Sequence, residues 1–513
     1  MYFVLLLAGY IFLYPAKTAK YFQFQPAISK MQALFIGRKE EKRILTKALQ
    51  SHEAELVAIV GRRRVGKTHL VRSAYEGRIQ FEMTGIQNGT LQEHLQHFTN
   101  RLNFHIKPTI PYPVPANWMD AFQMLILHFD KQDLRNKIVL FFDELPWIAT
   151  RKSGFLKAFG LFWNSWASQK QVVIVICGSA ASWMIQKVVR DKGGLHNRIT
   201  RRIQLEPFSL AETQAYFNSK SFRLTPYQTI QLYMALGGIP HYLKEVEGGQ
   251  SAAQNIDRIF FSKSSFLREE FDLLYPALFE NAERHIKIIR ILAATWQGLS
   301  RKELIAAARF SNGGTVTKTI EELVHSGFIM PFYGFGKKKK GIRYRLTDEY
   351  SIFYLKFIEN KRIEESGMWN KFSQTQTYKI WTGFAFENIC LKHIPQIKKA
   401  IGISGVYSET STYRSQGLNG NPGAQIDLLI DRNDHVINLC EIKFYNTDFT
   451  VTKAFAQELR TKMGVFQQDT KTRKQLFWTL LTTFGLNANE HSIGLIDQVL
   501  TMDILFQEEE VVR

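Results

Sequence analysis

Residues Leu56–Thr68, with the sequence LVAIVGRRRVGKT, set the architecture of the first half of this chain. An apolar, β-branched run comes first, a glycine-rich octapeptide follows, and a helical pattern begins at His69. The octapeptide matches G-x-x-x-x-G-K-[ST] in the order of strand, loop and helix that makes this motif specific for phosphate binding. The segment therefore predicts a parallel α/β sheet whose first loop binds a nucleotide through Gly61, Arg62, Arg63, Arg64, Val65, Gly66, Lys67 and Thr68.

Each residue type in this loop has a physical role. Glycines let backbone N–H groups wrap the β-phosphate, and the start of the following helix adds positive potential. Lys67 supplies a point charge to the β and γ oxygens, and the hydroxyl of Thr68 would hold Mg²⁺. We therefore expect ATP and Mg²⁺ as cofactors.

A second buried strand delivers two carboxylates. The run Ile138–Phe142 is too apolar for a solvent-facing strand, and it leads into Asp143 and Glu144. Ligands of open parallel sheets bind at the carboxyl ends of the strands. We expect Asp143 to orient the shell of the Mg²⁺ ion, and Glu144 to polarise the water that attacks the γ-phosphate.

Two further polar features follow a third apolar strand, Gln171–Cys177. Ser179 comes directly after this strand and is a candidate γ-phosphate sensor. Downstream, one of three arginines is a candidate arginine finger, acting in cis or across a subunit interface: Arg198, Arg201 and Arg202. A solvated basic turn is the alternative for each of them.

The composition restricts the class of protein. The 513 residues suggest roughly three or four domains, and a hydrophobic fraction of 45% excludes a disordered or fibrous chain. A net charge of +20 indicates polyanionic partners, meaning nucleic acid or an anionic membrane surface. The cysteines are far apart within apolar runs, so we expect buried thiols in a reduced, cytoplasmic compartment: Cys177, Cys390 and Cys440.

The chain begins with an apolar, uncharged stretch, Met1–Tyr14. A membrane-spanning helix needs about 20 such residues, so this stretch is too short. Lysines follow the apolar run instead of preceding it, which argues against a signal peptide. An export or anchor segment stays open, and so does a start codon assigned too far upstream of Met31.

A basic segment lies in the middle of the chain. Residues 284–348 contain thirteen Lys and Arg and four Asp and Glu. The segment therefore has a net charge of +9, nearly half of the +20 of the whole chain. The pattern predicts three helices and then two strands: His285–Trp296, a helix that Ser300 caps with Glu303 in a capping box, Thr315–Ser326, Phe328–Tyr333 and Ile342–Leu346. This order is similar to that of winged helix-turn-helix domains.

In the DNA-binding members of that family, the third helix enters the major groove and the wing contacts phosphate. The resemblance implies nucleic-acid contacts, with DNA as the expected partner, from Lys318, Lys337, Lys338, Lys339, Lys340 and Arg343. Such contacts position a protein on nucleic acid without reading its sequence. A module for protein contacts is the alternative, because winged helices in ATPases also have that role.

Two strands near the C-terminus, Gln425–Ile430 and Val436–Phe444, form a predicted hairpin. If the hairpin closes on the loop 433–435, Asp427 lies directly opposite Glu441, and Lys443 faces the same side. Two carboxylates about 5 Å apart at Cβ repel each other unless a cation lies between them. A divalent metal is the natural candidate, with Lys443 orienting the attacking water or stabilising the developing charge.

This arrangement resembles the PD-(D/E)XK nuclease superfamily, with Asp427 and Glu441-Ile442-Lys443 as its core motif and Glu387 as the acid of a preceding helix. The resemblance implies a catalytic Lys443 and a metal site made of Glu387, Asp427 and Glu441. The residue before Asp427 is not the proline of the superfamily motif. Three interpretations stay open: an active nuclease, an inactive version that binds nucleic acid, and charged residues that are salt-bridged within the sheet.

The chain from about residue 33 onward resembles the prokaryotic AAA+-like P-loop ATPases that carry a C-terminal nuclease-like domain. The likeness includes Phe35-Ile36-Gly37-Arg38, which would line the adenine pocket, and it favours Arg198 as the finger. It implies an α/β protein with five parts: an N-terminal extension (1–30), a P-loop ATPase core with a parallel sheet (31–206), a helical lid (207–283), a winged helix-turn-helix (284–365) and an α/β nuclease-like domain (366–513).

Two functions follow from these expectations. The first is a Mg²⁺-dependent ATPase coupled to a DNA-directed, metal-dependent nuclease-like domain. The second is a nucleotide-dependent switch or scaffold whose C-terminal domain binds nucleic acid or a protein partner without cutting. A homo-oligomer stays open, whereas membrane attachment rests only on the first fourteen residues and is not expected.

Overall fold

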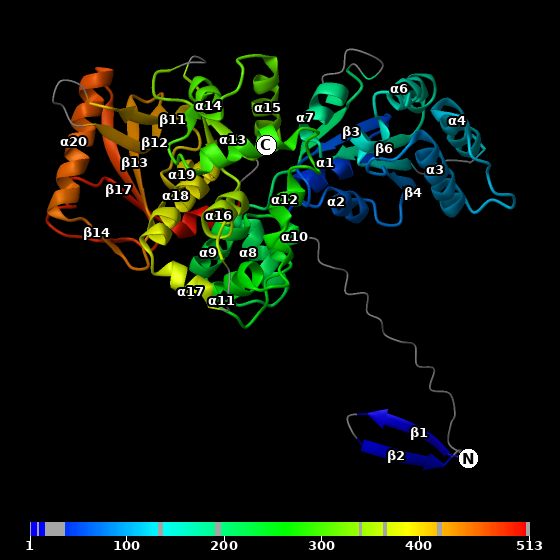
Figure 1. Cartoon of the computed structure of the whole chain (residues 1–513), viewed down its shortest axis with the longest axis horizontal. Helices are drawn as coiled ribbons and strands as arrows, with labels where there is room; N and C mark the ends of the chain where they lie inside the picture. Colours follow the sequence, from blue (N-terminus) through cyan, green and yellow to red (C-terminus); the bar gives the residue numbers. More distant parts are fainter. Residues whose placement is uncertain are drawn as a thin grey trace. The chain divides into compact units, whose positions relative to one another are not determined.

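The computed structural model of the chain describes residues 2–7, 10–15, 36–131, 137–189, 195, 197–337, 341–362, 367–417 and 423–508 (Figure 1). It divides into two compact units, Met1–Phe35 and Ile36–Arg513. In the first unit, β1 (Tyr2–Leu7) and β2 (Tyr10–Pro15) pair as an antiparallel hairpin. Within the described residues, none of the helices combines the length and the hydrophobicity that a membrane-spanning segment needs.

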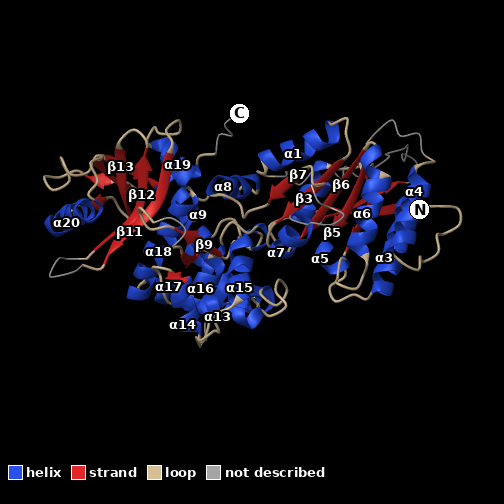
Figure 2. Ribbon diagram, turned by 90° about the horizontal axis from the view of Figure 1, so that it is seen from above, coloured by secondary structure: helices blue, strands red, loops and turns tan. Residues whose placement is uncertain are grey.

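The second unit begins with a five-stranded parallel sheet, one of the two large sheets drawn in red in Figure 2. Its strands lie in the order β4 (Ile79–Thr84), β5 (Ile138–Asp143), β6 (Val172–Gly178), β3 (Glu55–Val60) and β7 (Arg201–Gln204). Every residue of β3, β5 and β6 is buried, as expected for parallel strands covered on both faces. Because these three strands are neighbours, the segments that follow them meet at one edge of the sheet.

Helices of the same region pack on this sheet around an aromatic core. They are α1 (Lys39–Gln50), α2 (Lys67–Ala74), α3 (Leu91–Ile106), α4 (Trp118–Phe129), α5 (Leu145–Ile148), α6 (Phe155–Ser165) and α7 (Ala181–Met184). Trp118 of α4 meets Phe155 of α6 edge to face, with ring centroids 4.8 Å apart. Such close packing holds the strands, and therefore the loops that follow them, in one arrangement.

A group of helices follows the sheet: α8 (Leu210–Ser219), α9 (Pro226–Leu236), α10 (Pro240–Leu243), α11 (Ala252–Ile256) and α12 (Glu270–Leu274). Ser209 caps α8 in a capping box with Glu212. Gly238 is required by a close approach, because a Cβ atom there would lie 1.9 Å from the carbonyl oxygen of Phe208.

The basic segment contains α13 (Ala282–Ala293), β8 (Leu299–Ser300), α14 (Arg301–Ala308), α15 (Gly314–His325), β9 (Ile329–Phe332) and β10 (Arg343–Leu346). Its strands pair antiparallel in the order β8-β10-β9. The three predicted helices and two predicted strands are present, as is the capping box of Ser300 and Glu303. The sequence did not predict β8, because a strand of two residues leaves no alternating pattern.

A second five-stranded sheet occupies the C-terminal part, in the order β11 (Ser408–Ser415), β12 (Ala424–Arg432), β13 (Val436–Lys443), β15 (Gln475–Thr482) and β17 (Gln498–Thr501). The other elements here are α16 (Glu349–Phe357), α17 (Met368–Ser373), α18 (Gln376–Lys392), α19 (Ile394–Ala400), β14 (Phe449–Thr450), α20 (Lys453–Thr470) and β16 (Leu486–Asn487). In the hairpin, Leu428 lies opposite Cys440 and Asp431 opposite Ile437, so the predicted register is confirmed.

Helices from separate stretches of chain come together around α9. It packs against α8 and α11, its neighbours in sequence, and also against α16 and α18, which follow the basic segment. The nucleotide-binding part, the basic segment and the C-terminal part therefore belong to one compact unit.

Candidate functional site

The loop between β3 and α2 depends on its two glycines. Gly66 has a φ of 95°, which only glycine adopts without strain. A Cβ atom on Gly61 would lie 2.4 Å from the carbonyl oxygen of Leu205, so a side chain there would collide with the backbone after β7. The buried Lys67 ammonium donates to the carbonyl oxygens of Gly61 and Arg62, both at 2.9 Å. The loop thus holds its lysine over its own backbone.

Thr68 and Asp143 meet at the carboxyl edge of the sheet. The Thr68 hydroxyl donates to Oδ2 of Asp143 at 2.6 Å. The other carboxylate oxygen accepts from the Cys177 thiol at 2.8 Å and from the backbone N–H of Glu144 at 2.9 Å. Burial and the Asp143 charge raise the pKa of Cys177 well above its usual value, so the thiol keeps its proton and acts as the donor. A hydroxyl beside a carboxylate is the oxygen donor set that Mg²⁺ takes together with phosphate oxygens, so these residues fit that ion.

Glu144 and Ser179 also meet, one strand apart. Glu144 has a φ of 47° and follows β5 directly. Its Oε2 accepts from the backbone N–H of Ser179 at 3.0 Å and from the Ser179 hydroxyl at 2.8 Å. The residues predicted as water-polarising acid and γ-phosphate sensor are therefore in direct contact beside the Thr68–Asp143 pair.

The three candidate finger arginines lie elsewhere. The register of β3 with β7 sets Arg201 beside Val57, and its guanidinium pairs with Glu55 at 2.7 Å. Arg198 is exposed and comes before β7, at the edge of the sheet opposite the phosphate loop. Arg202 is exposed as well. A finger acting in cis therefore does not fit this geometry, because parallel strands carry the phosphate loop at their other end.

The side chains of two loop arginines bind carboxylates from later elements. The buried Arg62 guanidinium forms an ion pair with Asp348, and it lies 4.5 Å from the ring centre of Phe328. Arg64 pairs with the buried Glu270 at 2.8 Å. Because these side chains are engaged, the prediction that Arg62 and Arg64 bind nucleotide now applies only to their backbone N–H groups. No local sequence signal reveals such pairs, because Asp348 lies 286 residues after Arg62.

The segment predicted to line the adenine pocket contacts the helices after the sheet. Arg38 is buried, and its guanidinium lies 4.6 Å from the ring centre of Phe208. Its backbone N–H donates to Oε1 of Glu212 at 2.8 Å. Gly37 allows this approach, since a Cβ atom there would lie 2.4 Å from the same oxygen. Phe35 lies outside the described residues.

A second group, the carboxylate cluster, consists of Glu387, Asp427 and Glu441. Oδ2 of Asp427 accepts from the backbone N–H of Ile442 at 3.0 Å. The buried Glu441 accepts from Lys443 at 2.7 Å and, through both oxygens, from Lys462 at 3.0 and 3.1 Å. Burial, together with the Glu441 and Glu387 carboxylates, raises the pKa of Asp427 well above its usual value. Lys462 was not predicted, because it lies on α20, outside the hairpin.

Each of the other two predicted metal ligands has a cationic partner. Glu387 is buried on α18 and pairs with Arg345 of β10 at 2.8 Å. Glu441 is held by Lys443 and Lys462. Among the residues that the structure describes, no group of three or more His, Cys, Asp or Glu side chains is arranged to hold a metal ion. In this arrangement the cluster does not fit a metal, and its charge is compensated by lysine and arginine.

Some of the side chains predicted to contact nucleic acid are exposed, and others are held in contacts within the segment. Lys318 lies on α15 with 60% of its side chain exposed, and its ammonium is 3.7 Å from Glu322. Arg343 is engaged within the segment, pairing with Glu303 at 3.1 Å and donating to the Gly298 carbonyl at 2.8 Å. Lys337 is exposed. Three further predicted contacts lie outside the described residues: Lys338, Lys339 and Lys340.

Comparison with known proteins assigns one part of the chain to a family of domains. Residues 35–246 match the model of a family described as an ATPase domain predominantly from Archaea. This part is an archaeal-type P-loop ATPase domain. An uncharacterised protein of Methanocaldococcus jannaschii is 25% identical over 434 residues, which cover 84% of this chain and 92% of that protein.

Two solved structures are similar to this chain at low identity. A Walker-type ATPase of Pyrococcus abyssi is 16% identical with a TM-score of 0.44, over 62% of this chain and 95% of that one. The ORC2 protein of Aeropyrum pernix, solved as ADPNP–ADP complexes, is 13% identical with a TM-score of 0.36, over 64% and 93% of the two chains. Similarity at this level assigns no function to the present chain.

Proposed function

We propose that this protein binds and hydrolyses ATP with Mg²⁺, and that its nucleotide state acts on a DNA-directed C-terminal domain. The observation that carries the proposal is the contact of Thr68 with Asp143 beside the contact of Glu144 with Ser179. The loop N–H groups and Lys67 would hold the phosphates, while Thr68 and Asp143 would hold the metal ion. When bound, Mg²⁺ neutralises charge on the β- and γ-phosphates.

Glu144 is the proposed water-positioning residue. Two hydrogen bonds from Ser179 fix its carboxylate at the end of β5, next to the proposed metal ligands. Ser179 would then sense the γ-phosphate, because a phosphate oxygen competes with Glu144 for its hydroxyl. An exposed Arg198 at the opposite sheet edge would act across a subunit interface, so the active form would be a homo-oligomer.

Nucleotide binding tests the site. Titration with a fluorescent ATP analogue should show tight binding by the wild type and its loss in Lys67→Ala. Equal affinity of both proteins would contradict a nucleotide site at this loop.

The proposed finger is tested by hydrolysis. Arg198→Ala should reduce ATP hydrolysis without reducing ATP binding, whereas Arg202→Ala, which changes a neighbouring exposed arginine, should leave hydrolysis unchanged. Mixing Arg198→Ala with Glu144→Gln should restore part of the activity if Arg198 acts in trans.

A metal-dependent nuclease is the second candidate function. The register of β12 with β13, which sets Asp427 next to Glu441, favours it. The ion pairs of Glu387 and Glu441 favour the alternative, a switch or scaffold whose C-terminal domain binds without cutting. Cleavage of linear and structured DNA with Mg²⁺ or Mn²⁺, with and without ATP, distinguishes them. If the wild type cleaves DNA and the Asp427→Ala, Glu441→Ala double variant does not, the C-terminal domain is a nuclease. If neither protein cleaves any of these substrates, the nuclease is excluded and the scaffold function is supported.

Binding of DNA by the basic segment is tested separately. The proposal rests on the net charge of this segment and on the exposed Lys318. If Lys318 contacts a phosphate, Lys318→Ala should lower the slope of log affinity against log salt by about one unit. Lys47→Ala, an exposed lysine on α1, serves as the control. An unchanged slope for Lys318→Ala would remove α15 from the proposed interface.

A further inference from the structure

The phosphate loop is joined to α16 by Arg62. Through its carbonyl oxygen, Arg62 accepts a hydrogen bond from Lys67 at 2.9 Å, and through its guanidinium it pairs with Asp348. Among the described residues, Nε and one terminal nitrogen of this guanidinium have no hydrogen-bond partner, although both are buried. A lysine that moves onto a phosphate leaves the Arg62 carbonyl. Lys67 and Asp348 are thus linked through the backbone and the side chain of one residue, Arg62.

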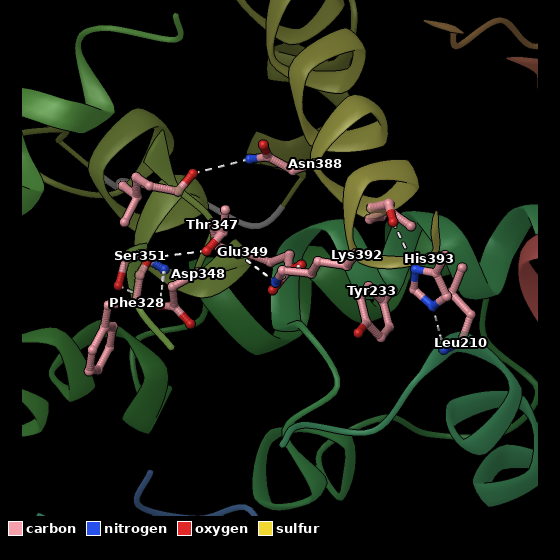
Figure 3. A network of polar contacts seen from close by, with 12 residues as sticks. Leu210, Tyr233, Phe328, Thr347, Asp348, Glu349, Ser351, Asn388, Lys392 and His393 are labelled. Carbon is pink, nitrogen blue, oxygen red and sulfur yellow. Dashed lines mark hydrogen bonds and ion pairs between the residues drawn. The ribbon is translucent and has the colours of Figure 1, made fainter. Parts of the chain in front are cut away.

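Asp348 begins helix α16. Its Oδ2 accepts from the Ser351 backbone N–H at 2.9 Å and from the Ser351 hydroxyl at 2.5 Å, so it is the N-cap of this helix. The next residue, Glu349, is buried and accepts from Lys392 at 2.6 Å (Figure 3). Lys392 also donates to the Thr347 carbonyl at 2.6 Å. One short stretch thus binds the phosphate loop on one side and α18 on the other.

Helix α18 carries Glu387 of the carboxylate cluster. Five residues before Lys392, Glu387 pairs with Arg345, and the neighbouring Asn388 donates to the Leu346 carbonyl at 3.2 Å. At the end of the helix, His393 accepts from the backbone N–H of Leu210 at 3.3 Å, as Figure 3 shows. The same helix therefore carries one carboxylate of the cluster, is bonded to residues 345–349, and at its C-cap is bonded to the start of α8.

We propose that nucleotide binding at the phosphate loop is coupled to the position of α18, and so to the Glu387 carboxylate, through the ion pairs Arg62–Asp348 and Glu349–Lys392. This inference rests on the proposed function, since it assigns the regulation of the C-terminal site to the nucleotide. Ion pairs with a buried carboxylate suit such a role, because separating them leaves an unpaired buried charge, so the two ends move together. Glu349 and Lys392 are positioning residues, as they reach the cluster only through α18.

Hydrogen exchange of α18 tests the coupling in the full-length protein. Mg²⁺ with ATP should change the exchange rates of the backbone amides of residues 385–391 at least about fivefold. In the Glu349→Gln, Lys392→Met double variant, which removes both charges together, the change should disappear while the affinity for ATP stays within about twofold. Removing the exposed pair near the other end of α16, with Arg290→Met and Glu359→Gln, should leave the change intact.

The outcomes separate this inference from the proposed function. If the wild type does not bind ATP, the proposed function fails and the coupling with it. If the wild type binds ATP and α18 shows no change, only the coupling fails, and this result needs no variant. If the double variant folds and keeps the full change, the Glu349–Lys392 pair does not carry the coupling, and the proposed route to α18 fails. Lys392→Arg, which keeps the charge, should retain the change even where the double variant is too unstable to study.

Discussion

At the scale of single residues, arginine in the phosphate loop has two separate functions. Its backbone belongs to the loop that wraps phosphate, while its side chain stabilises a contact with a distant segment. Arg62 and Asp348 are both almost fully buried, with side-chain exposures of 3% and 2%. Burial alone would raise the pKa of Asp348, but the Arg62 charge and the hydrogen bonds from Ser351 and Arg62 together outweigh it and hold that pKa below its usual value. This aspartate is therefore ionised in the folded protein at neutral pH.

Removing one partner of this pair should destabilise the protein strongly. Arg62→Met leaves Asp348 as an unpaired buried charge, and Asp348→Asn leaves Arg62 unpaired, so each should cost about 3 to 5 kcal/mol of unfolding free energy. The double variant should cost less than the sum of the single changes. Urea unfolding of the four proteins measures the coupling, and additive costs would show that the two side chains do not interact.

Lysine in the carboxylate cluster gives a second prediction at this scale. The cluster does not fit a metal ion while the Lys462 ammonium donates to both oxygens of Glu441. Lys462→Met removes this competing cation, so the affinity of the cluster for Mn²⁺ should rise about tenfold, the value of one charge-assisted hydrogen bond. Calorimetric titration with Mn²⁺ measures it. Lys474→Met, which removes the cation paired with Asp431 of the same hairpin, is the control. Equal affinities in all three proteins would mean that Lys462 does not compete with a metal ion.

At the scale of elements, α18 is held at both its middle and its end. Nδ1 of His393 donates to the carbonyl oxygen of Ile389 in the last turn of α18 at 2.7 Å, and Nε2 accepts from the backbone N–H of Leu210 of α8 at 3.3 Å. Because Leu210 supplies an N–H, the facing nitrogen has to be an unprotonated acceptor. Burial lowers the pKa of His393 to about 4, in agreement with a neutral ring.

The junction of α18 with α8 should therefore weaken in mild acid. The unfolded histidine has a pKa of 6.5, so the stability that the neutral ring contributes is complete above that pH and is lost as the pH falls towards 4. The slope from this residue is at most about 1.4 kcal/mol per pH unit. His393→Asn should remove that part of the pH dependence of unfolding. A variant with the wild-type profile between pH 4 and 6.5 would contradict the assignment.

Elements with a periodic pattern were predictable from the sequence, and contacts between distant residues were not. Apolar runs in the sequence predict the buried strands of the ATPase sheet, and a three-residue loop predicts the register of the hairpin. Parallel strand order then brings Thr68, Asp143, Glu144 and Ser179 together. The partners Asp348, Arg345 and Lys462 were missed, because an ion pair between remote segments leaves no spacing in the sequence.

At the scale of the whole molecule, the nucleotide site and the carboxylate cluster lie in one compact unit. Arg345 from the basic segment neutralises Glu387, and Asp348, three residues later, neutralises Arg62. The segment 345–349 thus contacts both sites, which favours a protein whose nucleotide state and C-terminal activity are linked. For either C-terminal activity, cleavage or binding, the proposed function requires that ATP be hydrolysed at the edge of the first sheet.

Phosphate release from Mg²⁺-ATP by the wild type and by Glu144→Gln tests this requirement most directly. Glutamine keeps the size of the side chain and can still meet Ser179, but it cannot polarise water, so hydrolysis should fall at least about a hundredfold while ATP binding persists. Hydrolysis at the wild-type rate in Glu144→Gln, or none in the ATP-bound wild type alone or with DNA, would contradict the account.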